Sequence, residues 1–148
     1  MTDRIAVLNG PNLNLLGNRQ PRLYGRHTLA DVESSCAATA ARHGFGVVCR
    51  QSNHEGVLVD AVAELAGSVV GFVVNAGALT HTSIALRDAL SAIEVPIVEV
   101  HISNVYVREP FRHRSYLSDI ASGVIVGCGV QGYDFAVDRI AALVRDGG

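Results

Sequence analysis

The chain has 148 residues, a length typical of one domain that can bury a sizeable core. Its formal net charge of -2 gives no general attraction to nucleic acid or to anionic membranes. Cys36, Cys49 and Cys128 are scattered, which favours reduced thiols and a cytoplasmic location. The first residues lack the apolar stretch of a signal peptide, and no apolar run approaches the ~18 residues that cross a bilayer.

The chain contains no lysine, so all 12 of its basic residues are arginines. This composition excludes catalysis through a lysine Schiff base and a pyridoxal-phosphate lysine. It also excludes the Walker A phosphate loop, whose lysine reaches the phosphates.

Apolar stretches alternate with amphipathic ones along the chain. Strands are expected at residues 4–9, 45–49, 71–75, 96–104 and 123–126. Helices are expected after Thr28, after Asn53, after Thr82 or Ser83, and from about residue 133 to residue 145. This alternation implies right-handed crossovers and a parallel sheet covered on both faces. We therefore expect one α/β domain, a flavodoxin-like doubly wound five-stranded sheet in three α/β/α layers.

A polar, glycine-punctuated segment at residues 12–27 follows the first strand. Loops of this length are usually lids or binding loops, and Gly17 and Gly25 can serve as hinges. We expect a lid at about residues 17–25. Tyr24 on this loop either packs the loop down or acts as a phenolate base, whose ionised form neighbouring arginines such as Arg19 would favour.

Polar residues alternate along the fourth expected strand. Glu99, His101 and Ser103 project from one face, at the end of the sheet where ligands bind in parallel folds. A carboxylate two residues from a histidine can orient and tune the imidazole, although an ion pair that closes the strand would look the same.

Two further groups of polar residues are candidates for substrate binding. His81 and Asp88 are expected on one face of the helix before the fourth strand, where they could also be a solvated face. Arg108 and Arg112 suit a small oxygen-rich molecule, because guanidinium forks bind carboxylates and hydroxyls with fixed geometry.

Other site types fit less well. The glycines of residues 127–132 match GxGxxG. A dinucleotide fingerprint continues with another strand and an acidic residue about 20 residues on, whereas this sequence ends 16 residues after Gly132, so we expect a tight turn. Arginines and aromatics interleave at residues 106–116, but the cluster is too short to indicate nucleic-acid binding. His81, His101 and Glu99 lack the close ligand spacing of a metal site, so no metal is expected.

Seven segments, in order over nearly the whole chain, resemble the type II 3-dehydroquinate dehydratases. They are NGPNLNLLG at residues 9–17, RQP at 19–21, YG at 24–25, QSNHEG at 51–56, NAGALTHTS at 75–83, EVHISN at 99–104 and GVQGY at 129–133. The resemblance implies a flavodoxin-like fold, no cofactor or metal, and a homododecamer built as a tetramer of trimers. It also implies anti elimination of water from 3-dehydroquinate to 3-dehydroshikimate through an enolate.

The resemblance also implies roles for individual residues. Tyr24 would be the base, assisted by Arg19 and Arg108, and Asn12 would hold the water that stabilises the enolate oxygen. His101, oriented by Glu99, would protonate the departing hydroxyl. Asn75, Ile102 and Ser103 would receive the substrate carboxylate, His81 and Arg112 the ring hydroxyls, and Asp88 would reach in from a neighbouring subunit.

Two positions depart from the family pattern. Gln20 stands where glutamate is more usual, and Pro110 with the order Arg112-His113-Arg114 can reshape the turn beside the arginine clamp formed by Arg108 and Arg112.

The main alternative to an enzyme is a non-catalytic flavodoxin-like module that binds a small molecule. Against a phospho-acceptor module, the first strand lacks an acidic cluster.

Overall fold

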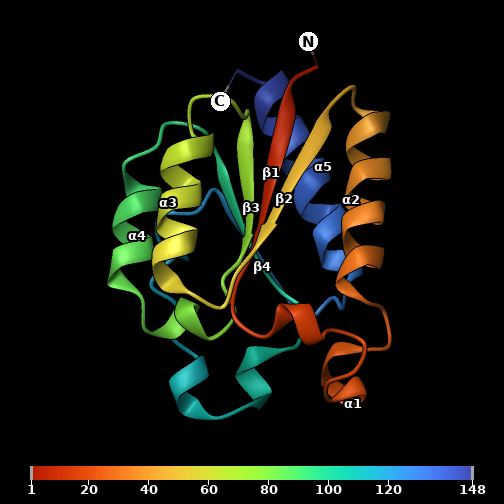
Figure 1. The fold of residues 1–148 in the computed structure, drawn as a ribbon, viewed down its shortest axis with the longest axis vertical. Helices are drawn as coiled ribbons and strands as arrows, with labels where there is room; N and C mark the ends of the chain where they lie inside the picture. The colour runs from red at the N-terminus through yellow and green to blue at the C-terminus, as the bar shows by residue number, and fades with distance from the viewer. Residues whose placement is uncertain (1, 148) are drawn as a thin grey trace.

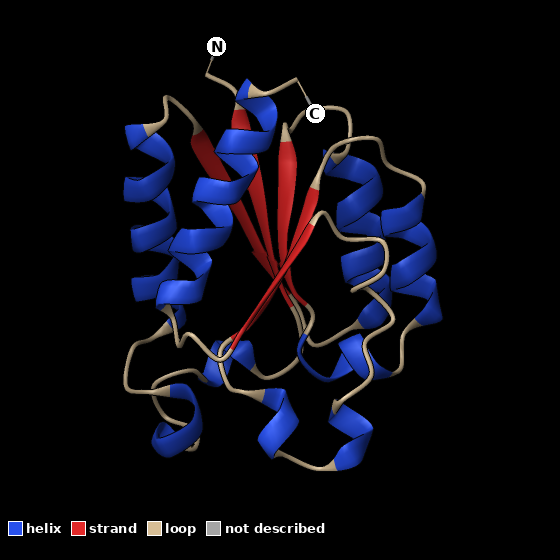
Figure 2. Cartoon of the chain, turned by 180° about the vertical axis from the view of Figure 1, so that it is seen from behind, coloured by secondary structure: helices blue, strands red, loops and turns tan. Residues whose placement is uncertain are grey.

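The computed structural model describes residues 2–147 and contains a single parallel sheet. Its strands are β1 (Arg4–Asn9), β2 (Gly46–Gln51), β3 (Gly71–Asn75), β4 (Ile97–His101) and β5 (Gly123–Val126), in the order β2-β1-β3-β4-β5. Helices α2 (Leu29–Arg42) and α5 (Gln131–Arg145) cover one face (Figure 1), and α3 (Glu55–Leu65) and α4 (Ile84–Ser91) cover the other (Figure 2). The predicted three-layer, flavodoxin-like fold is confirmed.

The core lies in two layers because successive strand residues point to opposite faces of the sheet. In β1, Ile5 and Val7 pack with α2 and α5, whereas Ala6 and Leu8 pack with α3 and α4. All four are buried, which explains why the strand reads as a continuous apolar run rather than as an alternating one.

The helix starts follow local capping chemistry. Thr28 and Asp31 form a capping box at the start of α2, and Ser83 accepts a hydrogen bond from the backbone of Leu86 at the start of α4. The prediction that Asn53 caps α3 was wrong, because the cap position is His54. The Asn53 side chain instead accepts a hydrogen bond from the backbone N–H of Asn12 at 2.9 Å, and so supports the loop after β1.

Several element bounds differ from those expected. β2 runs to Gln51 rather than to residue 49, and the fourth strand ends at His101, because Asn104 caps a short 3-10 helix, Val105–Val107. The segment at residues 12–27 contains a 3-10 helix, Leu13–Leu15, and a one-turn helix, α1 (Pro21–Tyr24), where a loop was expected. Other 3-10 turns occupy Gly77–His81 and Pro110–Arg112.

The glycines at residues 127–132 form the expected tight turn between β5 and α5. Gly127 and Gly129 have φ of 83° and 64°, a left-handed conformation that favours glycine. Gly132 lies against Val100 and Ile125, where a side chain would be crowded. Within residues 2–147, no helix combines the length and the apolar character that crossing a membrane requires.

Candidate active site

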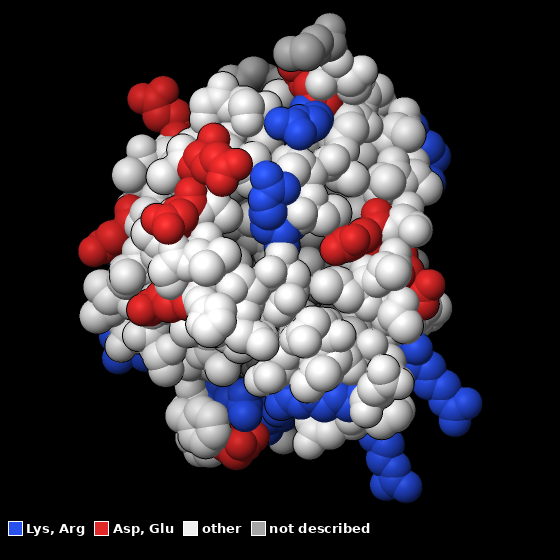
Figure 3. Space-filling view, in the orientation of Figure 1, with Lys and Arg blue, Asp and Glu red and all other residues white. Residues whose placement is uncertain are grey.

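A cavity of about 270 Å³ lies at the carboxyl end of the sheet, where parallel α/β folds bind their ligands. It is walled by the loops after β1, β3 and β4 and by the segment that carries α1. Figure 3 shows arginine side chains gathered at this lower end of the molecule, which would attract an anionic ligand. The predicted site residues that line the cavity are Asn12, Arg19, Tyr24, His81, His101, Ile102, Ser103, Arg108 and Arg112.

The loops after β1 and β3 meet at Gly10. The Gly10 backbone N–H donates to the carbonyl oxygen of Asn75 at 2.8 Å. A Cβ at Gly10 would come within 2.2 Å of the Ala76 carbonyl oxygen, so only glycine permits this approach. Asn12 follows in a left-handed conformation, with φ of 69°, which directs the chain along the cavity wall.

Tyr24 and the predicted arginines come together in the cavity. Arg108 donates from Nη1 to the Tyr24 hydroxyl at 3.0 Å and to Ser103 Oγ at 3.3 Å. The guanidinium carbons of Arg19 and Arg108 lie 5.5 Å and 5.7 Å from the centroid of the Tyr24 ring. Two guanidinium groups therefore flank the phenol, one from its own segment and one from the segment after β4.

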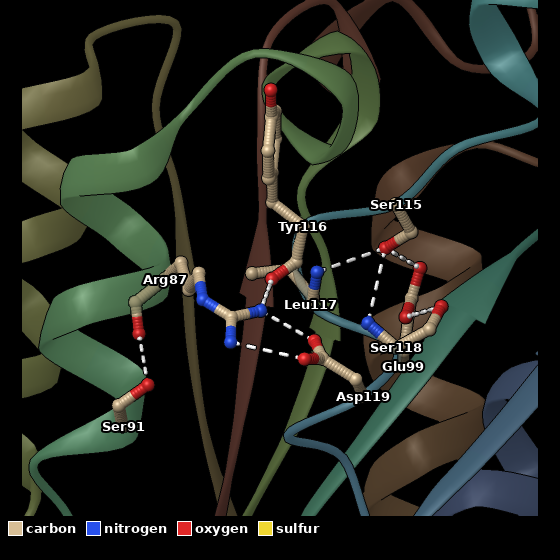
Figure 4. A network of polar contacts seen from close by, with 8 residues as sticks. All are labelled: Arg87, Ser91, Glu99, Ser115, Tyr116, Leu117, Ser118 and Asp119. Carbon is tan, nitrogen blue, oxygen red and sulfur yellow. Dashed lines mark hydrogen bonds and ion pairs between the residues drawn. The ribbon is translucent and has the colours of Figure 1, made fainter.

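Glu99 and His101 form a buried pair at the end of β4. The Glu99 carboxylate bonds to Nε2 of His101, and it also accepts hydrogen bonds from Ser115 and Ser118 (Figure 4). Burial would raise the pKa of Glu99, but the hydrogen bonds from His101, Ser118 and Ser115 and the charge of the imidazole outweigh burial and hold that pKa below its ordinary value. These hydrogen bonds favour the ionised carboxylate, and the contact with Nε2 holds the imidazole ring in place.

His81 lies beside His101 but not where it was predicted. It ends the 3-10 helix Gly77–His81 and precedes α4, so the prediction that it shares a helix face with Asp88 was wrong. Its ring stacks on that of His101, with centroids 6.3 Å apart. Nδ1 lies 2.7 Å from the carbonyl oxygen of Arg114, which can only accept, so Nδ1 carries the proton. Burial lowers the pKa of His81, and the neutral ring then presents Nε2 as an acceptor.

Two predicted substrate-binding residues do not line the cavity within one protomer. Asp88 is exposed on α4, in a hollow that it shares with Arg87 and Asp119. Asn75 is buried, and its amide nitrogen donates to the Tyr133 hydroxyl at 2.8 Å. The Tyr133 hydroxyl in turn donates to Asn9 Oδ1 at 2.6 Å, so a buried network joins β1, β3 and α5.

Three residues near the site were not singled out as site residues from the sequence. Ser115 and Ser118 contact Glu99 from a polar segment whose position beside β4 leaves no local signal. Tyr133 belongs to one of the segments that resemble the family, and this was the one sequence signal for it. Its contacts with Asn9 and Asn75 span 124 and 58 residues, so local patterns do not predict them.

The metal trio considered from the sequence is occupied by other contacts. Glu99 and His101 bond to each other, and Nδ1 of His81 bonds to a backbone carbonyl. In the described part of the chain, no group of three or more His, Cys, Asp or Glu residues is placed to hold a metal ion.

These features define the chain as a flavodoxin-like α/β protein with an acid–base site for a small molecule. The family model for class II dehydroquinases matches residues 3–141. The chain belongs to the class II dehydroquinase family.

Named relatives and solved structures extend this assignment. The chain is 62% identical over 141 residues to a 3-dehydroquinate dehydratase of Azorhizobium caulinodans, with 95% of each chain covered. It is 60% identical over 144 residues to a 3-dehydroquinate dehydratase of Streptomyces avermitilis, covering 97% of this chain and 91% of the relative. The type II dehydroquinase of Propionibacterium acnes superposes with a TM-score of 0.91 at 38% identity, covering 96% of this chain and 98% of that one.

Proposed function

We propose that the protein is a dehydratase that converts 3-dehydroquinate into 3-dehydroshikimate and water. The relatives that carry the name 3-dehydroquinate dehydratase support this substrate. The observation that carries the proposal is the pairing, in one cavity, of an arginine-bound phenol at Tyr24 with a carboxylate-bound imidazole at His101. These two groups can act as the base and the acid of an elimination.

In the first step, Tyr24 as phenolate removes the proton beside the substrate ketone. The electron pair of the broken carbon–hydrogen bond forms the carbon–carbon double bond of an enolate, and the carbonyl π pair moves onto the oxygen. The phenol keeps the proton. The charges of Arg19 and Arg108 stabilise the phenolate before the transfer. Asn12 holds the water that donates to the developing enolate oxygen, in a preorganised electrostatic role.

In the second step, the enolate collapses and the carbon–oxygen bond to the leaving hydroxyl breaks. His101 donates its proton to that oxygen, and water leaves. Glu99 remains ionised throughout and compensates the charge of the imidazolium before the transfer.

The remaining groups hold the substrate. Asn75 and the Ile102–Ser103 backbone receive the carboxylate. The side-chain amide nitrogen of Asn75 has two N–H groups, and only one of them donates to Tyr133, so the other can donate to the substrate. His81 accepts from one ring hydroxyl through Nε2, and Arg112 donates to another. Residues 17–25 act as a lid that excludes water, with Gly17 and Gly25 at left-handed φ of 94° and 76° as its hinges.

The working form in this proposal is a cytoplasmic homododecamer, a tetramer of trimers that needs no cofactor or metal. The exposure of Asp88 within one protomer supports its insertion into a neighbour's site. The three cysteines are unpaired, which suits a reducing compartment.

The testing experiment mixes the purified protein with 3-dehydroquinate and follows ultraviolet absorbance, since the product is a conjugated enone carboxylate and the substrate is not. We expect a rise that persists with a chelator and with borohydride, because neither a metal nor an imine takes part. Absence of a rise from folded, oligomeric protein would refute the dehydratase and favour a module that only binds a small molecule.

A further inference from the structure

The carboxylate of Glu99 is enclosed by a segment that the reaction above does not use. Ser115 Oγ donates to Glu99 Oε2 at 2.8 Å, and Ser118 Oγ donates to Oε1 at 2.7 Å (Figure 4). Each oxygen of this buried group therefore has a hydroxyl donor besides the contact with His101. The segment, residues 115–118, lies in the chain between Arg112 and β5, and it contacts β4 at Glu99.

The hydrogen bonds around Ser115 fix the direction of its hydroxyl. Its Oγ accepts the backbone N–H groups of Leu117 at 3.0 Å and Ser118 at 3.2 Å. With both lone pairs filled, the only remaining function of the hydroxyl is to donate, and its proton is aimed at Glu99. A protonated Glu99 could not donate back to this oxygen, so the contact favours the ionised carboxylate.

The segment is held in place from the outer side by α4. Arg87 donates from Nη1 to the Tyr116 carbonyl oxygen at 2.7 Å. It also forms an ion pair with Asp119 through Nη1 and Nη2 (Figure 4). The positions of Ser115 and Ser118 are thus set by contacts that do not involve Glu99, and the donors are in place before any charge develops.

We propose that Ser115 and Ser118 are positioning residues that keep Glu99 ionised, so that the shared proton resides on His101. A buried carboxylate and an imidazole can exist as an ion pair or as a neutral pair, and burial favours the neutral pair. In that neutral pair the proton lies on Glu99, and His101 is an uncharged imidazole, which is a much weaker acid towards a leaving group than an imidazolium. Two neutral hydroxyl donors shift the balance to the ion pair without adding a competing cation.

The inference rests on the proposed function for its catalytic consequence but not for the location of the proton. Other ionisable groups around the pair also affect this balance, and the test leaves them unchanged. They are His81 from the 3-10 helix after β3, Tyr106, Arg112 and His113 from the segment after β4, and Tyr24, Arg19 and Arg108 across the cavity. From β5 the pair meets only the apolar side chains of Val124 and Val126.

The experiment compares the wild-type protein with Ser118→Ala, which removes one donor but leaves the backbone contacts of Ser115 intact. Nuclear magnetic resonance of the full chain without substrate reports ¹⁵N shifts of the His101 ring and the ¹³C shift of the Glu99 carboxyl group. At a pH where the wild-type ring is an imidazolium, we expect neutral-ring signals in the variant and a Glu99 shift towards that of a protonated acid. Unchanged signals in folded Ser118→Ala would overturn the proposal.

Three controls separate this effect from a general loss of structure. Ser118→Thr keeps a hydroxyl and should restore the wild-type signals. Ser91→Ala removes a serine hydroxyl that bonds to the Arg87 carbonyl oxygen, in the same network but away from Glu99, and should change nothing. In a Glu99→Gln background, Ser118→Ala should have no further effect on the His101 ring, because the serine acts through the carboxylate.

Kinetics then tests the catalytic consequence. Ser118→Ala should lower kcat about tenfold with little change in KM, while exchange of the substrate's α-proton with solvent continues at the wild-type rate. Equal slowing of exchange and turnover would contradict a role through His101. If the wild-type protein proves inactive, the proposed function fails, but the resonance measurement still decides where the proton lies.

Discussion

The hydroxyl of Tyr24 lies 3.0 Å from Nη1 of Arg108, although 84 residues separate them in the sequence. The same Nη1 contacts Ser103 Oγ at 3.3 Å, so one guanidinium joins helix α1 to the loop after β4. The proposed base is therefore positioned by a residue from the far side of the cavity. In the proposed mechanism this one interaction both joins the lid to the segment after β4 and activates the base.

Replacement of Tyr24 by phenylalanine tests this arrangement. Tyr24→Phe should lower turnover by roughly 10²–10⁴-fold, the usual contribution of a general base. The partly buried ring keeps its packing, so the thermal unfolding midpoint should stay near that of the wild type. Steady-state ultraviolet assays and calorimetry measure the two effects, and near-normal activity would remove Tyr24 as the base.

Subunit mixing tests whether Asp88 acts in a neighbour's site. Asp88→Ala and Tyr24→Phe should each be inactive alone, because each homo-oligomer lacks one group in every site. Dissociated and reassembled together, they should regain part of the wild-type activity, since some sites then combine an intact Asp88 with an intact Tyr24. Reassembled mixtures that stay inactive while size-exclusion chromatography shows mixed oligomers would mean that Asp88 does not act in a neighbour's site.

Gly10→Ala tests the close contact between the loops after β1 and β3, and Gly56→Ala in α3 is its control. Gly10→Ala should destabilise the fold by roughly 1–3 kcal/mol, because its Cβ would lie 2.2 Å from a carbonyl oxygen. Gly56→Ala should stabilise the fold by about 0.4–1 kcal/mol, because its Cβ would meet nothing within 4 Å, and alanine restricts the unfolded chain. Urea unfolding of both variants measures the difference, and equal effects would show that the contact at Gly10 relaxes.

Tyr133→Phe tests the buried network behind the site. The change removes the donor to Asn9 and the acceptor for Asn75, which leaves two buried amides without this partner. We expect a loss of about 2 kcal/mol in the free energy of unfolding. If Asn75 receives the substrate carboxylate, KM should also rise. Unchanged stability would mean that water or a neighbour replaces the hydroxyl.

Acidification should destabilise the protein in two stages. The folded state lowers the pKa of His81, mainly through burial, so the unfolded state binds more protons as the pH falls below its ordinary value of 6.5. Burial opposes the shift at Glu99, but the hydrogen bonds from His101 and the serines lower its pKa, so a second loss begins below 4.5. Urea midpoints between pH 8 and about pH 3 measure both stages, and His81→Gln should remove the first.

Much of the fold follows from local sequence patterns. The bounds of β1, β3 and β5 were predicted because their apolar runs end at polar or glycine residues. The predicted end of β2 falls two residues too early because Arg50 and Gln51 are polar. β2 is an edge strand, and an edge strand tolerates polar residues that an inner strand does not.

The site was predictable where its contacts are local. Glu99 and His101 are two residues apart on a strand, and this spacing is enough to predict their pairing. Ser118 reaches the same carboxylate from 19 residues away, and Asn53 reaches Asn12 from 41. Such contacts depend on how irregular segments cross the end of the sheet, which periodicity does not encode. His81 was misplaced because a 3-10 turn, rather than an extension of α4, follows β3.

The bond from Tyr133 to Asn9 also bears on how the protein is synthesised. Asn9 and Asn75 leave the ribosome before Tyr133 exists, and without its hydroxyl their buried amides have no partner from α5. Nascent chains that stop before α5 should therefore stay open at the centre of the sheet. The buried amides of β1 and β3 therefore gain this partner only after the last helix of the fold has been synthesised.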